Sequence, residues 1–403
     1  MELFWLEHKK LWRKKIVKIC VLLCFVYCVI FGSILLFQWF GFGSSDDYTS
    51  AFGNNFDGYT VIKDSQEYAL SFGGELTDET LQKIVSDYQQ MEADGMGEEL
   101  EKTDWQIVNS WLGTLYPELR DTSNYKTMIS YVDPDKLTGF YERRQQVLDE
   151  FLEVSGQVGA EKEFLHQIER KVEKPFHYEW VEGWSTLLGS MVADLGVVMA
   201  LFLGIVLSSL FAGEWHDNTS TLVLTTRNGW GKIALAKILT GLAFTVELFA
   251  LLAVSNVISQ LFFMGTAGWD MPIQNIKLIA VAPMNMLQAE IYEYAFVLLG
   301  AIGFAGIVMF ISAAVKNNVL TLLLSLAVVY GPMMIAEYLP YEMQKALDLI
   351  PLVGSSTDIF RTNTFRIFGK LIWSPYLLIT IPVLIGILCM PFAIKSWSRR
   401  MKA

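Results

Sequence analysis

The stretch LGSMVADLGVVMALFLGIVLSSLF, Leu188–Phe211, decides the fold class, because Asp194 is its one charged residue. A helix needs roughly 20 apolar residues to cross the ~30 Å hydrocarbon core of a bilayer. Five further segments reach or approach that length: Ile16–Phe40, Ala234–Phe263, Ile291–Val315, Val319–Glu337 and Pro375–Ile394. The sequence therefore predicts an α-helical polytopic membrane protein with six transmembrane helices.

The charged residues are few and unevenly placed. Only 18% of the chain is charged, against about 25% in an average soluble protein. Residues 41–187 hold 29 acidic and 12 basic side chains, and the rest of the chain is net basic. The overall charge of −11 therefore reflects one acidic insert, and it does not suggest nucleic-acid binding.

The insert, residues 41–187, is expected to be a large, mainly helical extracellular domain between the first and second membrane helices. It contains no cysteine, so it is expected to depend on a core of its own. Amphipathic periodicity predicts helices at Thr77–Met91, Asp135–Val154 and Glu161–Val172, and Thr77 has the character of an N-cap. Two short stretches, Tyr59–Ile62 and Tyr68–Phe72, are strand-like.

Orientation follows from the basic residues in the short flanks of the apolar segments, which favour the cytoplasm. Placing both termini inside puts fourteen basic residues there: Lys9, Lys10, Arg13, Lys14, Lys15, Lys18, Arg227, Lys232, Lys237, Lys316, Lys395, Arg399, Arg400 and Lys402. The outer flanks keep five: Lys277, Lys345, Arg361, Arg366 and Lys370. We expect a multi-pass protein of the cytoplasmic membrane of a bacterium, with residues 41–187 outside.

Residues 1–15 have the pattern of an amphipathic helix. Phe4, Trp5, His8, Leu11 and Trp12 follow helical spacing, and most of the charged residues lie on the other faces. Such a helix is suited to lie in the headgroup plane, with its cations against anionic lipid. The alternative is a basic flank that only sets topology.

Sites for chemistry are scarce. Cys20, Cys24 and Cys28 share one helical face and are best explained as packing residues. His166 and His177 lie near several glutamates without metal-ligand spacing, so we predict no metal. The chain has no nucleotide-binding loop and is predicted not to be an enzyme.

The segment between the second and third spans, residues 211–237 (FAGEWHDNTSTLVLTTRNGWGKIALAK), carries the strongest functional signal. It follows the second span with Glu214 and Thr219, and it leads into the third span through Lys232 and Lys237. In this order the chain resembles the permease subunits of ABC-2 type exporters. Asn218 stands where that family usually has glycine, and the arginine expected beside the lysine is displaced.

The resemblance implies a permease of an ATP-driven exporter that moves an amphipathic peptide, antibiotic or lipid-like substrate. Two separate ABC ATPase subunits would bind ATP and Mg²⁺, and a second copy or a related permease would complete the transporter, as in resistance to antimicrobial peptides. The residues expected to transmit force from the ATPase as surface charges are Glu214, Asp217, Arg227 and Lys232. The alternative for this segment is topogenic charge with a tight turn.

Two carboxylates within the spans are candidates for the translocation path, because an unpaired charge in hydrocarbon is costly. Glu247 lies near the middle of the third span and Asp194 in the outer third of the second. A hydrogen bond from Glu247 to a neighbouring helix is an equal alternative, and Asp194 could extend toward the interface. Small residues in Gly300–Gly306 predict close helix packing, either within the chain or at a dimer seam.

A second hypothesis for the whole chain belongs to a different functional class. In this hypothesis the chain is a membrane sensor or immunity protein whose extracellular domain binds a peptide or antibiotic without transport. The sequence leaves both hypotheses open.

Overall fold

The computed structural model describes residues 2–40, 62, 66, 73–95, 105–121, 126–188, 192–217, 219, 231–354 and 362–399. The side chains of 31–40, 105–106, 192–194 and 399 are not described.

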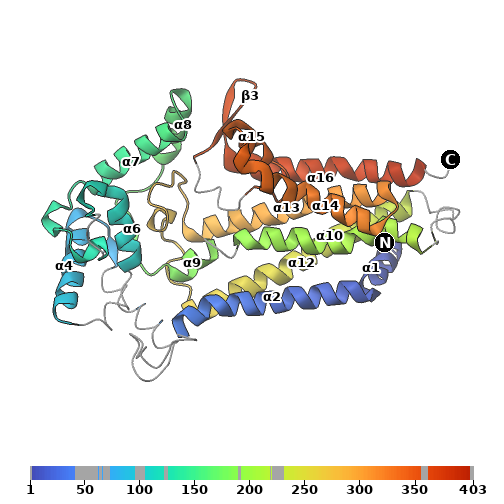
Figure 1. Cartoon of the computed structure of the whole chain (residues 1–403), viewed down its shortest axis with the longest axis horizontal. Helices are drawn as coiled ribbons and strands as arrows, with labels where there is room; N and C mark the ends of the chain where they lie inside the picture. The colour runs from blue at the N-terminus through green and yellow to red at the C-terminus, as the bar shows by residue number, and fades with distance from the viewer. Residues whose placement is uncertain are drawn as a thin grey trace.

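A bundle of long helices forms one end of the molecule, and a smaller helical domain, the head domain, forms the other (Figure 1). The long helices are α2 (Lys15–Phe40), α10 (Val192–His216), α12 (Lys232–Met264), α13 (Met286–Val315), α14 (Asn318–Ile335) and α16 (Ser374–Arg399). A short helix, α1 (Glu2–Arg13), precedes them. Both chain termini lie at the end of the bundle that is farther from the head domain.

Five helices among the described residues are long and apolar enough to cross a membrane, namely α10, α12, α13, α14 with its 3-10 extension to Tyr338, and α16. Each begins within a few residues of its predicted start, although α10 continues beyond the predicted end to His216. The first predicted span coincides with α2, a helix of 26 residues. This is the architecture of an α-helical, multi-pass membrane protein.

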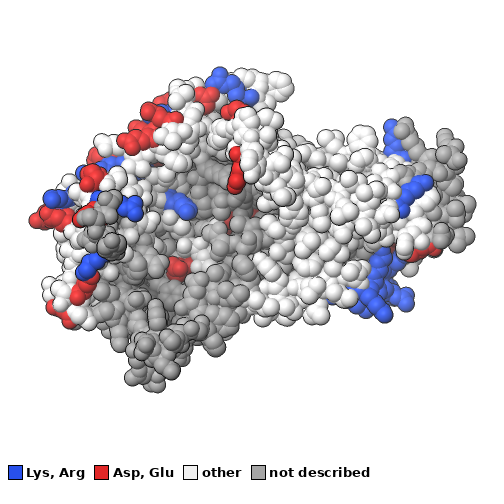
Figure 2. Space-filling view, in the orientation of Figure 1, with Lys and Arg blue, Asp and Glu red and all other residues white. Residues whose placement is uncertain are grey.

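Central and peripheral helices differ in what they expose. α13 packs against α10, α12, α14 and α16 and is mostly buried. α14 and α16 bury only 17% and 28% of their apolar windows, so their remaining side chains form an apolar outer surface. In Figure 2 the middle of the bundle shows no charged residue, while Lys and Arg gather at its far end. An apolar belt of this kind matches a lipid environment.

The predicted small-residue stretch makes a close contact between two helices. A Cβ built on Gly303 would meet the backbone oxygen of Pro382 at 2.3 Å, and one on Gly306 would meet that of Gly386 at 2.4 Å. The stretch Gly300–Gly306 therefore packs α13 on α16 within one chain. The three cysteines of α2 are likewise buried in the bundle core, as the packing interpretation predicts.

The head domain is built from short helices. They are α4 (Asp78–Ala93), α6 (Trp105–Leu115), α7 (Phe140–Val154), α8 (Ala160–Glu169) and α9 (Glu182–Thr186), with 3-10 turns at Pro117–Leu119, Met128–Ser130 and Pro134–Lys136. Strands β1 (Gly74–Glu75) and β2 (His177–Tyr178) pair antiparallel. The Thr77 side chain accepts a hydrogen bond from Thr80 N, which confirms the predicted cap. The predicted strands fall outside the described residues, except for Ile62, which is helical and buried.

The core of the head domain is built mainly from the insert itself, and one further segment of the chain adds to it. The loop from α12 to α13, which contains a 3-10 turn at Ile273–Asn275, supplies Leu278 to its core. Arg144, fully buried, donates to Leu278 O at 2.7 Å and to Ala280 O at 3.2 Å. Loop carbonyls thus satisfy a buried guanidinium that also pairs with Glu169. The insert between α2 and α10 and the loop between α12 and α13 are far apart in the sequence, but they pack together at this end of the molecule.

The connection from α14 to α16 contains a 3-10 turn (Ala336–Tyr338), α15 (Tyr341–Leu347) and a hairpin of β3 (Thr364–Ile367) and β4 (Lys370–Trp373). Leu352 is buried in the bundle core, and its side chain approaches Gly196 of α10 and Gly300 of α13. The described part of the connection therefore dips between the helices.

Replacing Gly306 by alanine should destabilise the bundle by about 1–3 kcal/mol, because its Cβ would overlap the α16 backbone. Gly331→Ala on α14 is the matched control, since a Cβ there meets nothing within 4 Å and alanine favours helix. Thermal unfolding of the detergent-solubilised chain measures both. Equal changes in the unfolding temperature of the two variants would contradict the close α13–α16 contact.

Candidate functional site

Charged side chains from three helices and one turn meet at the end of the bundle where both chain termini lie. Glu7 and Lys10 come from α1, Lys14 from the turn between α1 and α2, Glu214 from the last turns of α10, and Lys237 from the start of α12. We call these five residues the charge cluster. It connects α1 to the two helices that border residues 218–231.

Glu214 is the centre of the charge cluster. Its side chain is 4% exposed, and its Oε1 accepts from Lys237 Nζ at 2.8 Å and from Lys10 Nζ at 2.5 Å. Its Oε2 accepts from the Thr219 hydroxyl at 2.5 Å. Both carboxylate oxygens are therefore satisfied although the group is withdrawn from water, which a buried carboxylate requires.

Lys237 links Glu214 to α1. Its side chain is 2% exposed, and its Nζ also donates to Glu7 Oε2 at 2.8 Å. One buried ammonium is thus held between carboxylates from α10 and from α1. Removing either partner would leave a buried charge incompletely compensated, which costs several kcal/mol.

The two lysines outside the spanning helices respond differently to this environment. Burial alone would lower the pKa of Lys10, but the hydrogen bond and charge of Glu214 outweigh it and raise that pKa above its ordinary value. This stabilisation is present at neutral pH and is lost only as the pH rises through the folded-state pKa. Burial, reinforced by Lys237 and Lys10, lowers the pKa of Lys14. Lys14 instead donates to Ser209 Oγ at 3.0 Å.

A second contact fixes α1 to α12 at Glu247. His8 Nε2 lies 3.1 Å from Glu247 Oε1, and Trp12 Nε1 donates to Glu247 Oε2 at 3.1 Å. The Trp12 ring also packs edge-on against Phe244, with 5.9 Å between ring centroids. The carboxylate is 42% exposed and bonds to α1, so the neighbouring-helix interpretation of Glu247 fits its position.

The amphipathic pattern of α1 explains this docking, although not as expected. Glu7 and Lys10 follow at i and i+3, on the same side of α1 as buried Leu11, and Lys14 comes in the turn directly after the helix. Part of the charged face predicted to meet lipid headgroups is therefore turned toward α10 and α12. Trp5 and Leu6 remain 63% exposed and are free to meet lipid.

The predicted coupling residues divide into buried and exposed ones. Glu214 was expected at the surface, but α10 continues through it to His216 and brings it into the ion pairs. Asp217 and Lys232 are exposed, at the two ends of the undescribed segment. Arg227 lies outside the described residues. Asp194 lies on α10, and its side chain is also outside the described part.

Sequence reasoning missed several functional candidates. Glu7 and Lys10 were placed on the charged face of an amphipathic helix at the lipid headgroups, because their partners lie more than 200 residues away. Glu290 and Glu293, in the first turns of α13, are 4% and 0% exposed. The prediction began this span at Ile291, which left Glu290 in a loop. The sequence signal that could have found them is the spacing of Glu290 and Glu293, three residues apart at the start of an apolar segment, which places both on one side of a helix.

The histidines of the head domain do not gather ligands. His166 Nε2 lies 2.9 Å from Asp149 Oδ1, as in a surface ion pair. Among the described residues, no group of three or more His, Cys, Asp or Glu side chains is arranged to hold a metal ion.

Comparison of the chain with protein-family models, with curated proteins and with solved structures found no match in any of the three.

Glu214→Gln should destabilise the protein by about 3–5 kcal/mol, because it leaves Lys237 buried with only Glu7 as its counter-charge. The double variant Glu214→Gln/Lys237→Met should recover part of that loss, since it removes both charges. Thermal unfolding in detergent measures both.

The matched control is Asp217→Asn, three residues further on and exposed, which should change stability by no more than about 0.5 kcal/mol. The buried network would be refuted if the control and Glu214→Gln were equally destabilised.

Proposed function

We propose that this chain is the membrane-spanning permease subunit of an ATP-driven exporter of the ABC-2 type. The observation that carries the proposal is the charge cluster, which ties α1 to both helices bordering residues 218–231. The sequence of this region is also where the resemblance to such permeases lies. Separate ATPase subunits, two per transporter, would bind ATP and Mg²⁺ and act on this segment.

The proposed orientation places six spans in the cytoplasmic membrane, with α2 as the first and both termini inside. It is supported by the two termini lying at one end of the bundle (Figure 1), which an even number of spans requires. It is also supported by the Lys and Arg residues at that end (Figure 2), since cytoplasmic flanks are basic. The head domain would then be extracellular.

In the proposed mechanism, exposed Asp217 and Lys232 contact the ATPase, while Glu214 transmits force inside the permease. A displacement of the end of α10 would carry α1 and the start of α12 with it, because separating their ion pairs would strand buried charges. Rigid-body movement of packed helices is a common way of opening a path between subunits. A second copy or related permease would supply the opposite wall.

The translocation path is proposed to include Asp194 and Glu247. Glu247 is 42% exposed, and His8 and Trp12 bond to its carboxylate oxygens. A movement of α1 would break these contacts and leave the carboxylate free to bond to substrate. α1 thus combines two roles, as an interfacial helix and as the element that pairs with this carboxylate.

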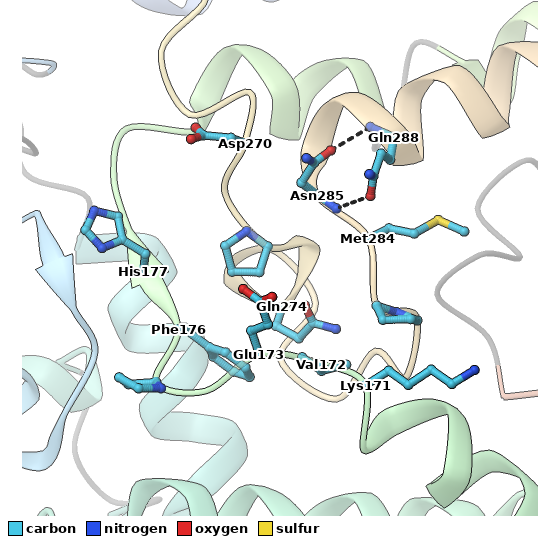
Figure 3. Close-up of a pocket in the computed structure, with 13 residues that line it drawn as sticks. Lys171, Val172, Glu173, Phe176, His177, Asp270, Gln274, Met284, Asn285 and Gln288 are labelled. Atoms are coloured by element: carbon cyan, nitrogen blue, oxygen red, sulfur yellow. Dashed lines mark hydrogen bonds between the residues drawn. The ribbon is translucent and has the colours of Figure 1, made fainter.

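A sensor or immunity protein remains the alternative. The observation that favours it is a cavity of about 380 Å³ between the head domain and the α12–α13 loop (Figure 3), which could bind a ligand without transport. The two functions differ in whether a partner ATPase depends on this chain.

Reversing the exposed charges, Asp217→Lys and Lys232→Glu, should reduce substrate-stimulated ATP hydrolysis by at least tenfold in vesicles containing the permease and its ATPase. Each change opposes an electrostatic contact across the proposed interface. Lys277→Glu, an exposed lysine at the opposite end, is the control and should retain stimulation. If the permease variants behaved like the control, these two residues would not be coupling residues.

A further inference from the structure

Two buried glutamates lie in the bundle at the end beside the head domain. Glu290 and Glu293 belong to the first turns of α13, within the span Met286–Val315. Glu290 is 4% exposed and Glu293 is fully buried. Because they are three residues apart, both lie on one side of the helix. Neither takes part in the proposed coupling, and an ionisable side chain inside a span is costly enough to indicate a function.

Glu290 has no counter-charge. Neither of its carboxylate oxygens has a hydrogen-bond partner among the residues that the structure describes. Lysine and arginine are absent from the halves of α2, α10, α12, α14 and α16 that lie beside the head domain. Arg144, a buried cation of this end, pairs with Glu169. Lys345, another, pairs with Glu342.

The titratable neighbours of Glu290 on α13 and α2 supply no positive charge. Tyr294, one turn further along α13, interacts electrostatically with both glutamates and with Cys28 of α2. Its hydroxyl is not bonded to Glu290, because neither that hydroxyl nor the Glu290 oxygens have a hydrogen-bond partner in the described part of the chain. The Tyr294 ring packs edge-on against Phe249 of α12, with 6.1 Å between ring centroids. A phenol and, beyond it, a thiol therefore adjoin the pair of glutamates.

The other elements packed against α13 add no cation either. At this end their titratable residues are Glu182 of α9, Asp194 of α10, Tyr330 of α14 and Tyr376 of α16, and α12 contributes none. Each of these side chains is acidic or neutral.

Water has little access to the pair. Gln288, at the edge of the cavity in Figure 3, is exposed. It precedes Glu290 by two residues, a rotation of about 200° that places the two side chains on opposite sides of α13. Met286 and Val297 share the side of Glu290 and are fully buried. The cavity therefore does not extend to Glu290, which is not among its lining residues.

A carboxylate in these surroundings cannot keep its charge. Burying it without a counter-charge costs several kcal/mol, and a second carboxylate on the same side of the helix adds repulsion. A proton removes the charge and needs no hydration shell. A metal ion would need several ligands, and no group of three or more His, Cys, Asp or Glu side chains that could hold one is found among the described residues. The proton is therefore the ligand that the surroundings of Glu290 fit.

We propose that Glu290 is a proton-binding site, which holds a proton in this conformation and releases it only when the start of α13 moves away from its neighbours. Glu293 adds to the cost of release, because two adjacent negative charges repel. The loop that precedes α13 also satisfies the buried Arg144 of the head domain. Proton binding is thereby linked to the position of the head domain. The proposal does not rest on the exporter function.

The test compares the same substitution at two buried glutamates, in the full chain in detergent without any ATPase. Glu290→Gln replaces a protonated carboxyl by a neutral amide of nearly the same shape. Glu214→Gln instead removes an ionised partner of Lys237. Glu150→Gln, at an exposed position on α7, is the control. The unfolding temperature of each variant and of the wild type is measured at about pH 6 and at about pH 9.

At about pH 6 we expect Glu290→Gln to lower the unfolding temperature by at most about half as much as Glu214→Gln does. Between the two pH values the wild type and Glu150→Gln should lose more stability than Glu290→Gln, because their folded state holds a proton that the unfolded state has released. A larger loss in Glu290→Gln at about pH 6, or an equal pH dependence in all three, would overturn the proposal. Recovery of wild-type stability at about pH 9 when sodium replaces choline would also overturn it, since the ligand would then be a metal ion.

A second measurement locates the proton in the wild-type chain. A nonpolar carbodiimide adds covalently to a carboxyl that carries its proton, and it reaches buried groups because it dissolves in the apolar phase. Peptide mass spectrometry should find the adduct on Glu290 at about pH 7, at least tenfold less of it at about pH 9, and none on Glu150, which is exposed and ionised at both. Absence of the Glu290 adduct, or equal amounts at both pH values, would overturn the proposal. None of these outcomes bears on the exporter assignment.

Discussion

A carboxylate and an ammonium withdrawn from water each cost several kcal/mol unless they pair, and Glu214 and Lys237 satisfy this requirement across α10 and α12 at 2.8 Å. The charges of this pair are fully compensated only when α1 is in place, because Lys237 also pairs with Glu7 and Glu214 also pairs with Lys10. The position of α1 is thus set by charge compensation as much as by lipid. Three helices at this end are obliged to keep their relative places or to move together.

The opposite end depends on a similar constraint. Arg144 is fully buried in the head domain and is satisfied by Glu169 and by carbonyls of the α12–α13 loop. The head domain is therefore fastened to a loop between two membrane helices rather than suspended from its own connections. Buried charges thus define both ends of the bundle, and α13 with its neighbours connects them.

The sequence allowed the apolar helices to be predicted closely, because hydropathy and length are local properties of a segment. The Thr77 cap and the glycine packing of α13 were predictable for the same reason. The contacts of Arg144 with the α12–α13 loop and of Lys10 with Glu214 were not, because these partners lie more than 100 residues away and no periodicity reports them. Glu214 was recognised as important but expected at the surface, since the pattern did not reveal that α10 continues past it.

The central claim of the proposed function is that the buried charges at the end of α10 transmit the force of a separate ATPase to α1 and α12. The most direct measurement is quantitative mass spectrometry of the chain after gentle extraction from its native membrane. The account predicts a P-loop ATPase in stoichiometric amount with the chain, retained in Lys277→Glu and diminished in Glu214→Gln. Recovery of the chain without any ATPase, or with a histidine kinase in its place, would contradict it.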